Sequence, residues 1–198
     1  MTGLAADVLA TLAEATSRLV ENLRRSVVVV HSASGYGSGL IWGGGELIVT
    51  NHHVLARPQA KVELFDGRRL TAEVVARDPY NDLAALSVGA KDLSAALIGD
   101  SRALRVGELI IAVGHPFGVR GSTALGIVSA VGKATWIGQT QRELLLANVL
   151  LAPGNSGGPL ANLAGHVVGI ASMVLSSRIA LVIPSHVVNR FIATLSPK

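Results

Sequence analysis

The 198-residue sequence contains no cysteine, and this absence excludes several kinds of chemistry at once. Without thiols the chain can form no disulfide, hold no cysteine-ligated zinc and use no cysteine nucleophile. Aromatic residues make up only 4% of the sequence, and the arginines behind the net charge of +4 are scattered along it. Nucleic-acid-binding surfaces usually cluster basic residues on one face, with aromatics between them. We therefore expect no nucleic-acid partner.

Long apolar runs are also missing. Residues 1–25 have the pattern of an amphipathic helix, in which Ala5, Leu12 and Leu19 recur every seven residues. Charged residues interrupt this segment, so it cannot span a membrane, and it lacks the basic start and uninterrupted apolar core of a signal peptide. Two interpretations stay open for this helix: it packs on its own domain, or its heptad spacing serves oligomerisation.

The remaining residues, 26–198, indicate an all-β domain. Nearly half of the whole sequence is apolar and 22 residues are glycine, with short Val/Ile/Leu runs separated by turns. A polar stretch over residues 89–107 divides these strands into two halves, and residues 186–194 are expected to form a closing helix. The glycine cluster at 35–39 precedes a strand instead of a helix, so it offers no phosphate site. We expect no cofactor.

The segment 152–160, with the sequence APGNSGGPL, places Ser156 among glycines and prolines directly after an apolar run. Prolines exclude a helix there, and glycines permit a tight turn whose N–H groups point inward together. An acyl-transfer nucleophile needs this arrangement, because donors must face the developing oxyanion. The alternative is a surface turn that happens to contain a serine.

Two further polar positions lie next to apolar strands. His52 and His53 are adjacent at a strand end, where neighbours point to opposite faces, so we expect a general base there and no metal site. Periodicity does not decide which histidine is the base. Asp82 precedes an apolar strand, and a buried carboxylate there would either orient a histidine or cap the strand start.

Three segments in this order, 50–54 (TNHHV), 78–84 (DPYNDLA) and 153–160 (PGNSGGPL), resemble the protease domain of the HtrA/Deg serine proteases, within the chymotrypsin-like superfamily. Supporting segments lie at 37–39, 114–118, 126–129 and 180–185, so the resemblance covers residues 27 to about 195. It implies two six-stranded antiparallel β-barrels (residues about 26–98 and 107–185), to which the residue pattern adds the N-terminal helix and the short C-terminal helix.

The resemblance also implies roles for the residues. His53 would be the general base, Asp82 the orienting acid and Ser156 the nucleophile, with Gly154, Asn155 and Ser156 forming the oxyanion hole. The specificity pocket would be lined by Leu150, Leu151, Ser172, Met173 and Val174. This lining is mostly apolar and contains no acid. It therefore predicts aliphatic side chains at P1, the residue before the cleaved bond. The resemblance itself implies a serine endopeptidase that acts on unfolded or damaged proteins.

The ends of the sequence differ from the family pattern. The sequence as given ends at Lys198 without a PDZ domain, so we expect either a member that lacks one or a trimmed sequence. No aromatic residue occurs in 1–25, where family members commonly trimerise. We expect a homo-oligomer, with a trimer favoured and the heptad helix as its contact. The compartment stays open: cytoplasmic for the sequence as it stands, extracytoplasmic or periplasmic if a signal was trimmed. Two alternative functions also stay open: a latent protease fold that binds proteins until activated, and an esterase.

Overall fold

A computed structural model describes residues 2–32, 35–44, 47–134, 141–176 and 178–195. The first half contains a long helix and six strands: α1 (Thr2–Arg24), β1 (Val27–Ser32), β2 (Gly35–Trp42), β3 (Leu47–Thr50), the 3-10 turn η1 (His52–Val54), β4 (Gln59–Glu63), β5 (Arg69–Asp78) and β6 (Leu83–Val88). These strands close into an antiparallel barrel in the order β1-β2-β3-β6-β5-β4.

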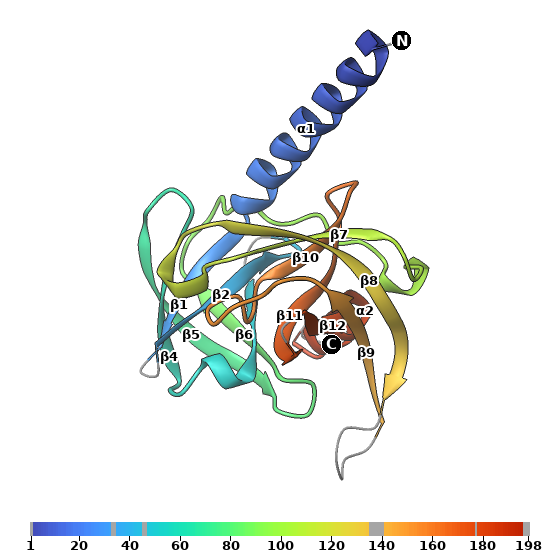
Figure 1. Ribbon diagram of the computed structural model, residues 1–198. Helices are drawn as coiled ribbons and strands as arrows, with labels where there is room; N and C mark the ends of the chain where they lie inside the picture. Colours follow the sequence, from blue (N-terminus) through green and yellow to red (C-terminus); the bar gives the residue numbers. More distant parts are fainter. Residues whose placement is uncertain (1, 33–34, 45–46, 135–140, 177, 196–198) are drawn as a thin grey trace.

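The second half forms another closed barrel, in the order β10-β11-β12-β9-β8-β7. Its elements are η2 (Ser101–Ala103), β7 (Leu109–Gly114), η3 (Pro116–Gly118), β8 (Ser122–Ala134), β9 (Arg142–Asn148), β10 (Pro159–Asn162), β11 (Val167–Ser176), β12 (Ile179–Pro184) and the closing helix α2 (Ser185–Ala193). The two barrels lie against each other, with α1 at one end (Figure 1). The expected all-β architecture, with one helix at each end of the chain, is confirmed.

An apolar layer joins the barrels. It combines residues of the first barrel, such as Leu40 and Leu83, with residues of the second, such as Ile111 and Ile170, and Phe191 of α2 covers it. Each barrel also has its own interior of aliphatic side chains. Because the shared layer draws on both halves, the cleft between them has fixed walls.

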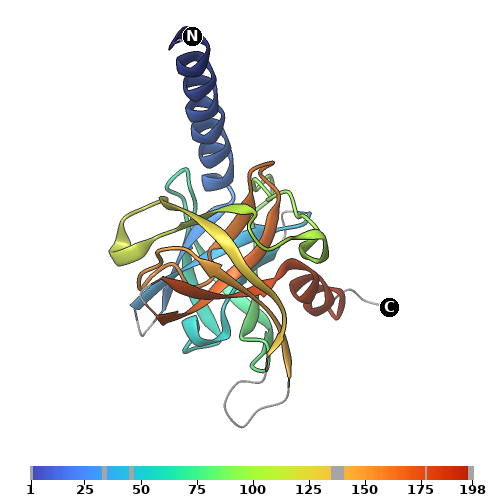
Figure 2. The ribbon, with the colours of Figure 1, turned by 45° about the vertical axis from the view of Figure 1, so that its right-hand side comes forward.

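Helix α1 is only half attached to this body. Leu23 is 5% exposed, and Leu19 and Val20 pack against the shared apolar layer. Leu9 and Leu12, from the same heptad pattern, are 65% and 56% exposed. In both ribbon views the N-terminal part of the helix stands away from the barrels (Figures 1 and 2). Packing on its own domain therefore accounts for the last turns of the helix and leaves the apolar face of the first turns uncovered.

Helix α2 is fixed to both barrels by polar contacts. Asn189 Oδ1 accepts a hydrogen bond from Trp42 Nε1 of the first barrel at 3.1 Å. On the second barrel, His186 Nε2 lies 2.6 Å from Glu143 Oε2, and Arg190 donates to Glu143 Oε1 at 2.8 Å. In the part of the chain that the structure describes, neither helix is long and apolar enough to cross a membrane.

Candidate active site between the two barrels

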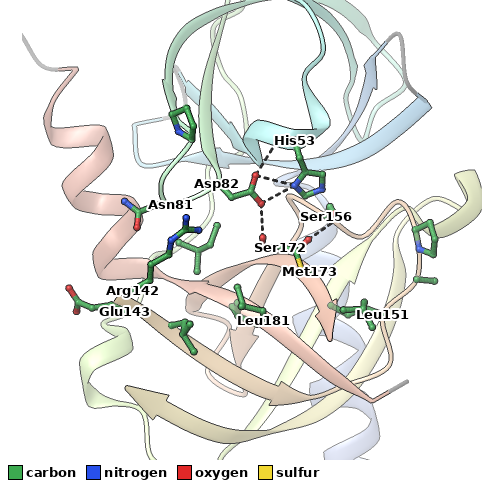
Figure 3. Close-up of a pocket in the computed structure, with 17 residues that line it drawn as sticks. His53, Asn81, Asp82, Arg142, Glu143, Leu151, Ser156, Ser172, Met173 and Leu181 are labelled. Atoms are coloured by element: carbon green, nitrogen blue, oxygen red, sulfur yellow. Dashed lines mark hydrogen bonds and ion pairs between the residues drawn. The ribbon is translucent and has the colours of Figure 1, made fainter. Parts of the chain in front are cut away.

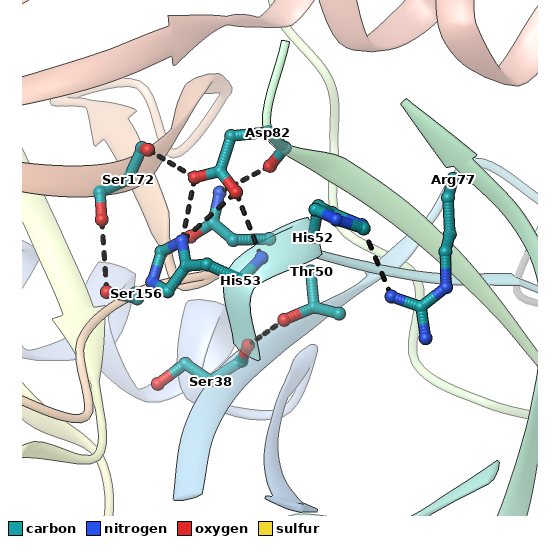
Figure 4. A network of polar contacts seen from close by, with 9 residues as sticks. Ser38, Thr50, His52, His53, Arg77, Asp82, Ser156 and Ser172 are labelled. Carbon is teal, nitrogen blue, oxygen red and sulfur yellow. Dashed lines mark hydrogen bonds and ion pairs between the residues drawn. The ribbon is translucent and has the colours of Figure 1, made fainter. Parts of the chain in front are cut away.

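The two histidines lie in the 3-10 turn η1, which follows β3 directly, and not on the strand where we expected them. The chain turns there because Leu55 N donates to His52 O, and because His52 N donates to Asp82 O. The rings nevertheless face different partners (Figure 4). His52 Nδ1 lies 3.2 Å from Arg77 Nη1, whereas His53 Nδ1 lies 2.8 Å from Asp82 Oδ2.

Asp82 is held between the histidine turn and the second barrel. It precedes β6 and adopts a positive φ of 55°, a conformation that aspartate tolerates better than most residues. Its carboxylate accepts hydrogen bonds from His53 N at 3.0 Å and from Ser172 Oγ at 2.6 Å, in addition to the His53 ring contact. Burial alone would raise the pKa of Asp82, but the hydrogen bonds from His53 and Ser172 hold it below its usual value. An ionised Asp82 fixes the tautomer that leaves His53 Nε2 as a proton acceptor.

Ser156 lies just after a tight turn that closes through a hydrogen bond from Asn155 N to Ala152 O at 3.0 Å. Pro153 and Gly154 occupy the two central positions, and Gly154 has a φ of 105°, as a type II turn requires. The Ser156 hydroxyl donates to the carbonyl oxygen of Ser172 at 3.1 Å. Among the described residues it has no hydrogen bond to His53, so the side chain must rotate before His53 can accept its proton.

The carbonyl groups around this turn are all bonded, as the following contacts show. Pro153 O accepts from Phe117 N, Gly154 O from Ser38 Oγ, Asn155 O from Gly158 N and Ser156 O from Ser38 N, at 3.0, 2.7, 2.9 and 2.8 Å. Within the described residues, the N–H groups of Gly154 and Ser156 have no acceptor. The N–H of Asn155 closes the turn and is therefore not available to an oxyanion. A pair of unsatisfied donors next to a serine hydroxyl is the geometry that stabilises a tetrahedral intermediate.

A cavity of about 720 Å³ opens beside the Asp82–His53 pair (Figure 3). It is lined by His53, Pro79, Asn81, Asp82, Arg142, Glu143, Leu144, Leu151, Ala152, Pro153, Ser156, Ser172, Met173, Val174, Leu181, Val182 and Ile183. Most of this wall is apolar. The cavity therefore offers a lipophilic site next to the serine.

Four of the five residues expected in the specificity pocket line this cavity: Leu151, Ser172, Met173 and Val174. Leu150 differs, because its side chain is 70% exposed and lies outside the lining. Neighbouring side chains in an extended segment point in opposite directions, so only one of Leu150 and Leu151 can face the cavity.

Ser172, which the resemblance placed only in the specificity pocket, also makes contacts that the sequence did not indicate. It lies where the pairing of β11 with β12 shifts register, between Ala171 and Met173. Its hydroxyl donates to Asp82 and its carbonyl accepts from Ser156, so it touches two of the three expected catalytic residues. No local pattern marks such a serine, because both contacts depend on how the barrels meet.

The acidic groups at the cavity wall are already paired. Hydrogen bonds from His186 and then Arg190 lower the pKa of Glu143 to about 2. The guanidinium of Arg142 lies 4.6 Å from the centre of the Tyr80 ring, and Tyr80 belongs to the turn that precedes Asp82. No group of three side chains suited to a metal ion occurs among the residues described.

Three comparisons with known proteins, by family model, by sequence and by structure, indicate the same family. A family model for the trypsin-like peptidase domain matches residues 37–170. A "Probable periplasmic serine endoprotease DegP-like" of Pseudomonas putida is 42% identical over 145 residues, which is 73% of this chain and 30% of that protein. Another of the same name, from Chlamydia muridarum, is 34% identical over 165 residues, 80% of this chain and 33% of that protein.

Solved structures agree with these sequence matches. The "HtrA-type protease AlgW with decapeptide" superposes with a TM-score of 0.83 at 26% identity, covering 90% of this chain and 66% of that chain. The chain thus spans about a third of the length of the curated relatives it matches. With its paired barrels and the serine turn between them, this chain belongs to the trypsin-like peptidase family, among the HtrA/DegP-like serine proteases.

Proposed function

We propose that the chain is a serine endopeptidase in which Ser156 is the nucleophile, His53 the general base and Asp82 the orienting acid. The observation that carries this proposal is the free N–H pair of Gly154 and Ser156, next to a histidine held by an ionised Asp82. His53 Nε2 takes the proton of Ser156 as Oγ attacks the peptide carbonyl. The negative charge that forms on the carbonyl oxygen is stabilised by the two N–H groups, and His53 then protonates the leaving amine.

The cavity supports a preference for aliphatic side chains at P1. Leu151, Met173 and Val174 contribute apolar surface, and Leu181 adds to it from β12. The two carboxylates in the wall are occupied: Asp82 by His53 and Ser172, and Glu143 by His186 and Arg190. A lysine or arginine side chain would thus lose its hydration without gaining a free carboxylate. A peptide library in which Arg or Lys dominates at P1 would contradict this preference.

Unfolded or damaged proteins are the substrate class that we propose. Met173 and Val174 of β11 are about half exposed beside the serine, so an extended substrate chain can lie along this strand. A folded protein rarely has an extended segment free to bind in this way, whereas an unfolded protein does. The curated relatives are named probable periplasmic serine endoproteases, which supports an extracytoplasmic location. We propose assembly as a trimer through the uncovered face of α1, because Val8, Leu9 and Leu12 are more than half exposed.

A latent form of the same enzyme is the second candidate. It is favoured by the hydrogen bond of the Ser156 hydroxyl to Ser172 O, which directs the nucleophile away from His53. In this state the fold would bind unfolded chains without cutting them until a ligand or partner released the serine.

Casein cleavage by the native chain and by Ser156→Ala, with mass measured by light scattering, tests these proposals. Cleavage by the native chain alone supports the endopeptidase, and equal cleavage by both forms contradicts it. If neither form cleaves casein, a peptidyl phosphonate probe separates the candidates, since labelling of Ser156 indicates a latent enzyme. An unlabelled serine in a properly folded chain would overturn both, and a monomeric mass at all concentrations would overturn the trimer.

A further inference from the structure

Ser38 is a fully buried serine of the first barrel that contacts the nucleophile turn of the second. It lies in β2, and its side chain is 0% exposed. Its backbone N donates to Ser156 O at 2.8 Å, and its hydroxyl donates to Gly154 O at 2.7 Å. Along the chain, these two acceptors lie on either side of the Ser156 N–H, one of the two donors assigned above to the oxyanion hole.

The position of these contacts along the turn matters because a peptide group is planar. The carbonyl of one residue and the N–H of the next point in opposite directions, so holding the carbonyl fixes the N–H. Four consecutive peptide planes run from Pro153 to Gly157. The first and third carry the free N–H groups of Gly154 and Ser156, and Ser38 binds the carbonyls of the second and fourth. Ser38 thus fixes the peptide planes directly before and directly after the one that carries the Ser156 N–H.

Ser38 also reaches the segment that holds the first plane. Its hydroxyl accepts a hydrogen bond from His115 N at 3.1 Å. Two residues later, Phe117 N donates to Pro153 O, the carbonyl whose plane carries the Gly154 N–H. The hydroxyl of Ser38 therefore links the nucleophile turn to the segment that begins at His115, and together these two segments orient both donors.

The same serine is tied to the strand that carries the general base. Thr50 Oγ1 donates to Ser38 O at 2.7 Å, and Thr50 is the last residue of β3, just before the histidine turn (Figure 4). Packing here is tight enough to explain the glycines after Ser156. A Cβ at Gly157 would lie 2.0 Å from Ser38 O, and one at Gly158 would lie 3.3 Å from Ser38 Cβ.

We propose that Ser38 is a positioning residue for the reaction: it sets the orientation of the Gly154 and Ser156 N–H groups and their register with His53. It touches no substrate. Removing its hydroxyl leaves the buried His115 N–H and Gly154 carbonyl without partners, and the turn can then rotate its peptide planes to satisfy them. The proposal rests on the endopeptidase function proposed above.

The chain offers a matched control in Ser185. This serine is also 0% exposed, its hydroxyl donates to a glycine carbonyl (Gly99 O, 2.6 Å), and it accepts from a backbone N–H (Ser101 N, 3.1 Å). Like Ser38, it is a buried hydroxyl that donates to one backbone group and accepts from another, but it lies at the start of α2, away from the nucleophile turn. Ser38→Ala and Ser185→Ala should thus lose similar stability, and only the first should disturb the turn.

The experiment compares peptide hydrolysis by the native chain, Ser38→Ala and Ser185→Ala. We expect kcat to fall about 10- to 100-fold in Ser38→Ala with KM within about twofold, because misdirected oxyanion donors act on the transition state. Ser185→Ala should keep kcat within about twofold. Equal kcat values in the two variants, or a loss confined to KM, would overturn the proposal. Should Ser38→Ala fail to fold, Ser38→Cys replaces it, and its weak donor should give an intermediate kcat.

Hydrogen exchange tests the same proposal without catalysis. In a Ser156→Ala background, the bonded amides of Asn155, Gly157 and Gly158 should exchange at least about tenfold faster when Ser38→Ala is added. Adding Ser185→Ala should leave their exchange unchanged. If the native chain hydrolyses nothing, the proposed function fails, yet this exchange difference still decides whether Ser38 holds the turn. Equal exchange in both variants would overturn the positioning role.

Discussion

At the scale of single residues, the site depends on groups that hold other groups in place. Asp82 has two hydrogen bonds from His53 and one from Ser172, and these keep its pKa low enough for it to stay ionised around neutral pH. A neutral amide at this position has a single accepting oxygen where Asp82 has two, and an NH₂ in the place of Oδ2 would face the His53 ring. The imidazole would then present the wrong tautomer to Ser156.

Asp82→Asn should therefore lower kcat by about 10⁴-fold at pH 7 while the fold remains intact. Steady-state hydrolysis of a peptide substrate measures this loss, and circular dichroism monitors the fold. Asp66→Asn is the matched control, since Asp66 lies in the exposed β4–β5 turn and contacts Arg68. Comparable kcat values for the two variants would show that Asp82 does not orient the base.

His115 is a second residue whose protonation affects the molecule. It is 5% exposed, and burial, together with the positive charges of Arg120 and Arg24, lowers its pKa to about 4, although Glu63 opposes this shift. In the unfolded chain His115 binds a proton as the pH falls through about 6.5, whereas in the folded chain it does so only near pH 4. Stability is thus complete above pH 6.5 and is lost as the pH falls toward 4.

We expect the free energy of unfolding to decrease by as much as about 3 kcal/mol between pH 6.5 and 4 through this one group. His115→Gln should reduce that pH dependence, because glutamine does not titrate and its oxygen can still accept from Gly121 N, the partner of His115 Nδ1. Urea unfolding at pH 7, 6, 5 and 4.5 measures the difference. His166→Gln, at an exposed histidine, should leave the slope unchanged. Parallel curves for all three proteins would exclude His115 as the origin.

At the scale of elements, α1 divides into two parts that its sequence does not distinguish. Leu9 and Leu23 share one heptad position, yet Leu23 is 5% exposed and Leu9 is 65% exposed. An isolated helical segment of this length is marginal in water, so the projecting turns gain stability only from a contact.

Leu23→Ala should destabilise the fold by about 3 kcal/mol, because it opens a cavity in the layer that joins the barrels. Leu9→Ala should change the unfolding free energy of the monomer by less than about 0.5 kcal/mol. Thermal unfolding at several protein concentrations measures both. A loss for Leu9→Ala that grows with concentration would support assembly through the helix, and a large loss at the lowest concentration would contradict the exposure of Leu9.

The elements also show what could be predicted from sequence. Residue types in three short segments indicated Ser156, Asp82 and a pair of histidines, because each chemical requirement is local to its segment. The choice of His53 and the two-barrel fold came from the family resemblance of these segments taken in order. The contact of Ser38 with Gly154 joins positions 116 residues apart, and that of Ser172 with Asp82 joins positions 90 apart. Such contacts depend on how two barrels meet, which no local periodicity records. Leu150 and Leu151 were not distinguished for a related reason, since the sequence does not show which of two neighbouring side chains faces the cavity.

At the scale of the whole molecule, the two barrels are joined by both apolar and polar contacts. The apolar layer contains Leu40 and Leu83 from one barrel and Ile111 and Ile170 from the other. Ser38 adds hydrogen bonds across the same boundary, and Trp42 Nε1 joins the first barrel to α2. Separating the barrels would expose this layer and break the site at once.

Unfolding should thus be a single transition, without a state in which one barrel survives. Fluorescence of Trp42, isolated in a Trp136→Phe variant, reports on the first barrel and α2. Far-UV circular dichroism reports on all strands, and the two urea curves should coincide. Two separated midpoints would show that the barrels unfold independently and that the shared layer contributes little.

The bond between the Ser156 hydroxyl and the Ser172 carbonyl has a consequence for inhibitors. A peptide that adds along β11 needs that carbonyl as an acceptor for its own N–H, so it displaces the serine hydroxyl as it docks. Binding of the peptide therefore also releases the Ser156 hydroxyl, which can then turn toward His53. Small electrophiles without a peptide arm would meet a serine still turned away. Peptidyl phosphonates should consequently label this enzyme faster than simple fluorophosphonates, by more than their affinity alone explains.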